Sequence, residues 1–321
     1  MANTRELRRR IKSIKNTSQI TKAMQMVAAV KMKRAQDQAT SGRPYVENLS
    51  EALVRLLPKV DLEAHPLLGE NKIATPAPGS VRDRNDGKVG VVLLSTDKGL
   101  VGALNTNLIR TLSNAQTWSG NSIFYTVGRK GRSFVARTGK DLKADFENLD
   151  TVTFRQAVQL SKLITESFLS GEIGEAYIVY PHFVSTLRQE AKRLKLLPID
   201  LQSVILSPKD EGSSTVGNSN RSGKIATVAT LPRDDKGEFL FEPNVDSLLD
   251  FILTHHIQIQ IYQALLETKA SEHSARMVAM KNATDNALEL VEDLQLTYNQ
   301  TRQEAITTEL LEITTAQVAM G

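Results

Sequence analysis

The chain has 321 residues, of which 40% are hydrophobic, a net charge of +4 and no cysteine, and this length predicts two domains or one elaborated domain. The lack of cysteine excludes disulfides, thiolate metal sites, cysteine nucleophiles and dithiol regulation. No apolar stretch approaches the roughly 18 residues that a membrane-spanning helix needs, and the start lacks the apolar core of a secretory signal.

The N-terminal segment predicts one long helix, because neither glycine nor proline occurs from Met1 to Ser41. Small and apolar residues recur there at alternating steps of four and three, the spacing of a coiled-coil seam. Large aliphatic side chains begin the seam, and small or polar ones follow from Ser18 to Ala28. The seam positions are Leu7, Ile11, Ile14, Ser18, Thr21, Gln25, Ala28, Met32, Ala35 and Ala39.

This first helix is strongly basic. Residues 1–36 carry ten basic side chains and one acidic one, a local charge of +9. Such a helix is suited to nucleic acid, an anionic membrane or an acidic protein surface, and a solvated face is the simplest alternative. Nucleic acid is disfavoured because no aromatic side chain lies among the charges to stack on bases. An acidic protein partner agrees best with a paired helix.

The middle of the chain predicts an α/β domain. Prolines and glycines from Pro58 to Gly87 indicate a loop-rich exit from the first helix. Strand-like and helix-like runs then alternate, which indicates a mostly parallel sheet. We expect strands at 89–96, 123–127 and 176–180, one or two more within 183–197, and helices at 103–115, 129–137 and around 160–168. Residues of about 207–236 are rich in Gly, Ser, Asn and charge, and indicate an exposed insertion.

The motifs of this domain do not indicate chemistry. The turn at 97–102 (DKGLVG) is neither G-x-G-x-x-G nor a Walker loop. The turn at 128–133 (GRKGRS) could cradle an anion at a helix start, although a tight turn with a solvated basic rim is the simpler interpretation. The five histidines, at positions 65, 182, 255, 256 and 273, form no metal-ligand spacing. We therefore predict no catalytic residue, no cofactor and no metal.

The C-terminal segment predicts a second, longer helix. The 77 positions from Asn244 to Met320 contain no glycine or proline, where the average of the chain predicts about seven. Such a helix would be about 115 Å long, and it needs a partner helix or an enclosing complex to bury its apolar stripe. Ala279, Ala283 and Ala287 predict a face of close approach. Further apolar positions on this side are Ile252, Ile259, Tyr262, Leu266, Leu290, Leu294, Tyr298 and Ile306.

These features predict an α/β fold with a long antiparallel coiled coil, although the periodicity alone also agrees with an ordinary helical bundle. In this fold the N- and C-terminal helices pair, and a central Rossmann-like α/β domain lacks a nucleotide site. The predicted parts are residues 1–57 for the first helix, 58–242 for the α/β domain with the insertion at about 207–236, and 243–321 for the last helix.

Ordered segments at both ends of the chain resemble the γ subunit, the central rotor shaft, of F-type ATP synthases. In the first helix the resemblance is carried by residues 11–17 (IKSIKNT), 20–29 (ITKAMQMVAA) and 31–36 (KMKRAQ). In the last helix it is carried by residues 275–287 (ARMVAMKNATDNA), 298–299 (YN), 302–307 (RQEAIT) and 309–313 (ELLEI). The middle contributes residues 95–100 (STDKGL) and 241–243 (FEP), so the resemblance covers nearly the full length.

The resemblance implies a left-handed antiparallel coiled coil inside a ring of three α and three β subunits. It implies that the α/β domain lies beneath that ring, with the ε subunit alongside, on the c-subunit ring of the membrane. Catalysis then belongs to β, and this chain couples proton flow to it by turning and regulates ATPase activity. Matching positions imply contacts with β at or near Met24, Arg276, Arg302, Gln303, Thr307 and Glu312.

The family pattern is not matched everywhere. The family's R-G-L-C-G-G turn reads Lys98-Gly99-Leu100-Val101-Gly102-Ala103 here. The insertion lies where photosynthetic γ subunits carry a regulatory segment, but without cysteine it cannot be a dithiol switch.

The expected location is peripheral, on the cytoplasmic side of a bacterial plasma (inner) membrane. The arginine-rich start leaves an organellar inner membrane, after removal of a targeting peptide, as the alternative. A coiled-coil scaffold or a nucleic-acid-binding adaptor is the functional alternative. The tip after Glu312 (ITTAQVAMG) is poor in charge, which argues against a scaffold, and an adaptor would bind with a steep salt dependence.

Overall fold

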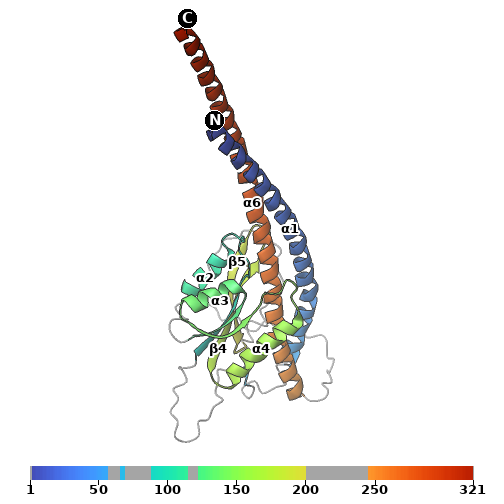
Figure 1. Cartoon of the computed structure of the whole chain (residues 1–321). Coiled ribbons are helices and arrows are strands. Elements are labelled where there is room, and N and C mark those ends of the chain that lie inside the picture. Colours follow the sequence, from blue (N-terminus) through green and yellow to red (C-terminus); the bar gives the residue numbers. More distant parts are fainter. Residues whose placement is uncertain (1, 57–65, 69–87, 115–121, 200–244, 321) are drawn as a thin grey trace, which may run out of the picture.

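The computed structural model describes residues 2–56, 66–68, 88–114, 122–199 and 245–320. The predicted insertion at about 207–236 lies outside these residues, and so do the predicted domain boundaries at 57/58 and 242/243. The described chain consists of a long two-helix shaft and an α/β domain packed against one part of it (Figure 1).

Two helices, α1 (Ala2–Leu56) and α6 (Val245–Met320), form the shaft. They run antiparallel, so that both termini lie at the same end of the molecule, with the C-terminus farther out (Figure 1). The 76 residues of α6 correspond to a length of about 110 Å. All ten predicted seam residues of α1 are buried or half-buried, which confirms the paired terminal helices.

On α6, the seam differs in part from the prediction. The hydroxyls of Thr21 and Thr284 lie 2.7 Å apart, and Met280, Thr284 and Val291 are buried. Leu290 and Ile306 were expected on the apolar face, but they are 47% and 44% exposed. The reason is the period: a four-residue repeat drifts around the helix, whereas the contact line alternates steps of three and four. Along this contact line the shielded positions are Met277, Met280, Thr284, Ala287, Val291, Leu294, Tyr298, Thr301 and Ala305, and the predicted close-approach residues Ala279 and Ala283 are half-buried as well.

The α/β domain contains one five-stranded sheet in the order β3-β2-β1-β4-β5. The neighbouring pairs β1–β2, β1–β4 and β2–β3 are parallel, and β4–β5 is antiparallel, so the predicted mostly parallel sheet is confirmed. The strands are β1 (Lys88–Leu94), β2 (Ser122–Val127), β3 (Asp141–Phe146), β4 (Ile173–Phe183) and β5 (Gln189–Leu197).

Helices cover both faces of this sheet. One face packs against α2 (Leu104–Asn114) and α3 (Arg129–Arg137), through buried residues such as Leu108 and Val135. The other face packs against α4 (Phe154–Leu169) and the first half of α6, with Leu53 of α1 in the same core. The shaft helix is therefore also a layer of the domain (Figure 1).

Strand β3 was not predicted. Its sequence, DLKADF, alternates exposed and half-buried positions and buries no side chain fully. It is an edge strand, and edge strands commonly carry charge that discourages further pairing. Its apolar residues, Leu142, Ala144 and Phe146, alternate with charged ones, so the run carries a period-2 strand signal, but it is short and much less apolar than the other strands.

A buried histidine on α6, His256, should make the folded chain less stable in acid. Burial lowers the pKa of His256 to about 4, below its ordinary 6.5, and its Nδ1 has no partner within the described residues. The unfolded chain then binds this proton more strongly, so stability falls as the pH drops from about 6.5 towards 4, by up to about 3 kcal/mol. Urea unfolding of His256→Leu across this range should show a flatter pH dependence, and an unchanged slope would contradict this assignment.

Candidate functional site

The carboxyl edge of the sheet is where α/β domains commonly bind nucleotides, and here its donors are already engaged. At the start of α3, the amide of Arg129 donates to Asp97 Oδ1 at 2.9 Å and that of Gly131 to Ser95 Oγ at 2.8 Å. The amide of Lys130 donates to the carbonyl of Thr96 at 3.1 Å. The 128–133 turn is thus a tight turn whose first amides bond within the chain.

Helix α6 covers the same edge beside β1. Ala275 packs with Val101 and Leu104, which follow β1 in the chain. Asn148, in the loop after β3, donates from Nδ2 to the carbonyl of Ser95 at 2.8 Å and to Glu272 Oε2 at 3.3 Å. Side chains of the shaft therefore occupy the space next to the end of β1.

A buried charge cluster of three α6 residues lies at this junction. Arg276 Nη2 is 2.8 Å from Glu272 Oε1, and Lys269 Nζ is 3.4 Å from Glu272 Oε2. The side chains of Lys269 and Glu272 are 5% and 6% exposed. Burial alone raises the pKa of Glu272, but the charges of Lys269 and Arg276 outweigh it and hold the pKa below its usual value. The cluster carries a net charge of +1.

The histidines bond to neighbouring side chains. His182 Nδ1 lies 2.6 Å from Glu267, His255 Nε2 lies 2.8 Å from Tyr45 Oη, and His256 Nε2 lies 2.8 Å from Gln260. His65 lies outside the described residues. Across the described ranges, no group of three or more His, Asp or Glu side chains is arranged to hold a metal ion. Among the same residues, no helix is both long and apolar enough to cross a membrane.

Known proteins match the chain from end to end. The family model described as ATP synthase matches residues 3–320. The ATP synthase gamma chain of Methylacidiphilum infernorum is 42% identical, and the match covers 100% of both chains. The ATP synthase gamma chain of Opitutus terrae is 40% identical, with 99% of both chains covered. The chain belongs to the family of ATP synthase gamma chains.

Solved structures agree with this family in fold. A chain of the Euglena gracilis mitochondrial ATP synthase (OSCP/F1/c-ring, rotational state 3) gives a TM-score of 0.62 at 21% identity, over 99% of this chain and 95% of that one. A chain of the Tetrahymena thermophila mitochondrial ATP synthase (central stalk/c-ring) gives a TM-score of 0.54 at 24% identity, over 82% and 99%. The shaft and its α/β domain are thus the gamma-chain fold.

The six residues expected to contact β fall into two groups on this gamma-chain fold. Met24 lies half-buried on α1, and Arg276 lies at the α/β domain, where its side chain is 13% exposed. The other four, Arg302, Gln303, Thr307 and Glu312, are exposed on the outer part of α6. Arg302 is 26 positions beyond Arg276, or about 39 Å along the helix. The structure therefore does not bring the six together.

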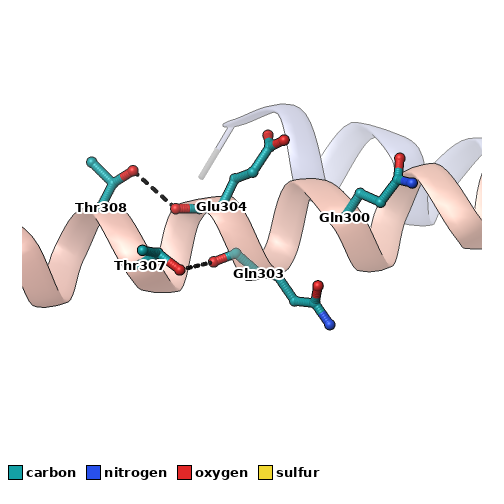
Figure 2. A pocket seen from close by; sticks show the side chains of 5 residues that line it. All are labelled: Gln300, Gln303, Glu304, Thr307 and Thr308. Carbon is teal, nitrogen blue, oxygen red and sulfur yellow. Dashed lines mark hydrogen bonds between the residues drawn. The ribbon is translucent and has the colours of Figure 1, made fainter.

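A surface hollow lies among the outer group. It is lined by Gln300, Gln303, Glu304, Thr307 and Thr308, whose side chains extend from one stretch of α6 (Figure 2). Thr307 donates its hydroxyl to the carbonyl of Gln303 and Thr308 donates to that of Glu304, both at 2.9 Å. The threonine hydroxyls therefore bond to their own helix, whereas within the described residues no hydrogen bond engages the side chains of Gln300, Gln303 and Glu304.

Sequence reasoning missed the charge cluster. Lys269, Glu272 and Arg276 are three and four residues apart, a spacing that places them on one helix face. Charges at this spacing also occur on any solvated helix, so the spacing alone does not reveal a buried cluster. Only the fact that this part of α6 is buried on nearly all sides distinguishes the cluster from a solvated face. Asn148 gave no signal, because its loop is brought to Glu272 by the sheet.

The cluster makes a stability prediction. Glu272→Gln leaves Lys269 and Arg276 buried without a counter-charge, so the free energy of unfolding should fall by about 3–5 kcal/mol. Lys269→Met should cost clearly less, since Glu272 keeps Arg276 and its bond to Asn148. Urea unfolding of both purified variants would measure the difference, and equal losses would refute the central role of this carboxylate.

Proposed function

We propose that this chain is the non-catalytic rotor shaft of an F-type, proton-translocating ATP synthase. It couples proton flow through the membrane sector to ATP synthesis on the β subunits by rotation, and it regulates ATPase activity. The observation that carries the proposal is the full-length match to gamma chains, on a fold whose main feature is a shaft. In this role, no cofactor and no nucleic acid is bound.

The partners are the α and β subunits around the shaft, the ε subunit, and the c-subunit ring below. One solved relative belongs to an assembly of OSCP, F1 and the c-ring, and the other to a central stalk with its c-ring. The outer end of α6 also favours an enclosing partner, because four large apolar side chains there are exposed: Leu310, Leu311, Ile313 and Val318.

Rotation of the shaft acts on the β subunits because the side chains differ from one side of the shaft to the other. A coiled coil with different side chains on each side makes different contacts with three chemically identical β subunits, and so favours a different conformation in each. The basic side chains of α1 lie largely exposed along it, where an acidic β loop can meet them. Met24, Arg276, Arg302, Gln303, Thr307 and Glu312 are the proposed β contacts.

The α/β domain is proposed as a Rossmann-like domain without a nucleotide site. Its support is the engagement of the α3 amides by Asp97 and Ser95, together with α6 lying over the end of β1. The proposed parts remain residues 1–57, 58–242 with an insertion at about 207–236, and 243–321. The proposed location is peripheral, on the cytoplasmic side of a bacterial inner membrane, as the bacterial relatives favour.

Purification from the native membrane tests the proposal. The chain should co-elute with the α, β and ε subunits and remain with the c ring in a gently solubilised complex. If the chain elutes alone, the scaffold is favoured instead. If it elutes with nucleic acid, and its binding to that nucleic acid weakens steeply with salt, the adaptor is favoured.

Met24→Lys should disturb coupling. The added cation would pair with the acidic β loop, and even a partly screened pair adds about 1 kcal/mol to a rotational barrier, or roughly fivefold in rate. ATP hydrolysis should persist while ATP-driven proton pumping falls. Met26→Lys is a matched control on the same helix, since Met26 is 58% exposed and two positions away from Met24. Equal losses of hydrolysis and pumping in Met24→Lys would count against the contact.

The tip of α6 and the base of the shaft should differ in their importance for coupling. Deleting Thr314–Gly321 removes apolar contacts that guide rotation, so the complex should assemble, rotate and hydrolyse ATP with a modest loss of rate. Arg276→Ala should damage coupling more, because it acts at the base of the shaft where torque arises. ATP synthesis in membrane vesicles measures both, and the roles are wrong if the deletion abolishes synthesis while Arg276→Ala leaves it normal.

A further inference from the structure

The contact between α6 and the α/β domain changes character along the helix. In its first part most buried side chains are apolar, His256 being the exception, and Leu253, Ile257 and Ile261 are 0% exposed in the core beneath the sheet. From residue 267 onward, polar side chains face the domain instead. We call the α6 residues Glu267, Lys269, Ser271, Glu272 and Ser274 the polar belt. Ser271 and Ser274 are both 0% exposed, so the belt is interior and not a solvated face.

The belt bonds to the domain on two sides of α6. On the side of β4, Ser271 Oγ donates to the carbonyl of Pro181 at 2.9 Å, and Glu267 lies 2.6 Å from His182. Just beyond β4, Ser274 Oγ donates to the carbonyl of Thr186 at 2.7 Å.

The loop after β3 supplies the second side. Lys269 Nζ donates to the carbonyl of Asn148 at 3.2 Å, and Asn148 Nδ2 donates to Glu272 Oε2 at 3.3 Å. The other helix is tied at the same loop, because Lys31 Nζ of α1 lies 3.1 Å from Asp150 Oδ2. Both helices of the shaft are therefore bonded to the domain in this region.

Apolar and polar contacts resist rotation differently. Apolar burial is non-directional, so a helix can turn slightly in an apolar groove with little change in buried area. A hydrogen bond weakens steeply once its angle or its length changes, and a buried group that loses its partner is costly. Successive residues of a helix are about 100° apart around its axis, so the belt residues point to different sides of α6. A small rotation of α6 about its axis therefore misaligns the hydrogen bonds on both sides at once.

We propose that the polar belt is a torsional lock, which fixes the rotational angle of the shaft relative to the α/β domain. It lies where α6 leaves the domain, and beyond this level α1 alone among the described elements accompanies the helix (Figure 1). Torque between the membrane ring and the catalytic ring has to cross this level. The inference rests on the proposed function, and it adds where within this chain the twist is resisted.

The test uses the whole membrane complex carrying Ser271→Ala and Ser274→Ala together. Ser274 also accepts from Gln189 Nε2 at 3.3 Å, so the double variant loosens the helix from both β4 and β5. Two readouts are needed: ATP hydrolysis by the detached catalytic sector, which works without load, and ATP-driven proton pumping against an imposed opposing membrane potential. Hydrolysis should be unchanged, and pumping at high potential should fall roughly tenfold, as the loss of two net hydrogen bonds predicts.

Thr268→Val is the matched control. Thr268 is 2% exposed and lies at the same level of α6, but its hydroxyl bonds to Ala264 of its own helix at 2.7 Å. This variant removes a buried hydroxyl bond without loosening the helix from the domain, so its pumping under load should equal that of the wild type. The angular spread of a probe on the c ring during pauses should widen in the double serine variant and not in the control.

A cross-link provides the rescue. The chain has no native cysteine, so His182→Cys with Glu267→Cys offers a single defined thiol pair within it. Joining that pair with a bis-maleimide in the double serine variant should restore pumping under load. If the double variant fails to assemble, Ser274→Ala alone is measured in its place, with the same expected direction.

The outcomes separate the two proposals. A wild-type chain that neither assembles nor pumps overturns the proposed function. A wild-type complex that pumps, beside serine variants that pump equally well under load, overturns the torsional lock. The torsional lock is also overturned if Thr268→Val loses pumping to the same degree, or if the cross-link does not restore pumping. In either case the loss of pumping would come from a general loosening of α6.

Discussion

The structure depends on one constraint: a helix as long as α6 must be covered along its whole length by something other than itself. The sheet, α4 and the C-terminal part of α1 cover the first part, and the rest of α1 covers the next. Thr21 meets Thr284, and equal steps outward from this pair place Thr4 level with Thr301. Beyond that level nothing in the described chain accompanies the helix, and its apolar side chains are exposed. The open end is therefore what a surrounding complex has to cover.

The same constraint explains the state of the sheet's carboxyl edge. An open parallel sheet offers a crevice at the strand ends. Here α6 enters that region as one layer of the domain, and Glu272, Asn148 and Ser95 join across it. The domain thereby serves as a base for the shaft, since side chains at this edge bond to α6. The fold is of a kind that can bind ligands, and its function comes from what fills the site.

Electrostatics divides the shaft into a buried and an exposed part. Inside, Lys269 and Arg276 are compensated by Glu272, because an unpaired charge there is very costly. Outside, α1 keeps most of its basic side chains in solvent, and Lys31 reaches Asp150. Surface pairs of this kind contribute little to stability, so the charge of α1 is available for recognition. Stability and partner binding therefore use largely different charges of the same two helices, and Arg276, a proposed β contact, belongs to both sets.

The sequence by itself determined the two helices, the seam of α1, the mostly parallel sheet and the family, because periodicity and the absence of breakers are local properties. Strand β3 was missed because its period-2 alternation is short and contains three charged residues. Leu290 and Ile306 were misplaced because supercoil drift is not encoded in local apolar content. The six candidate contacts gave no sign that the side chain of Arg276 is largely buried against the domain and pairs there with Glu272. Tertiary structure decided that point and the polar belt, because Asn148, Pro181 and Thr186 come from distant segments that only the folded sheet brings against α6.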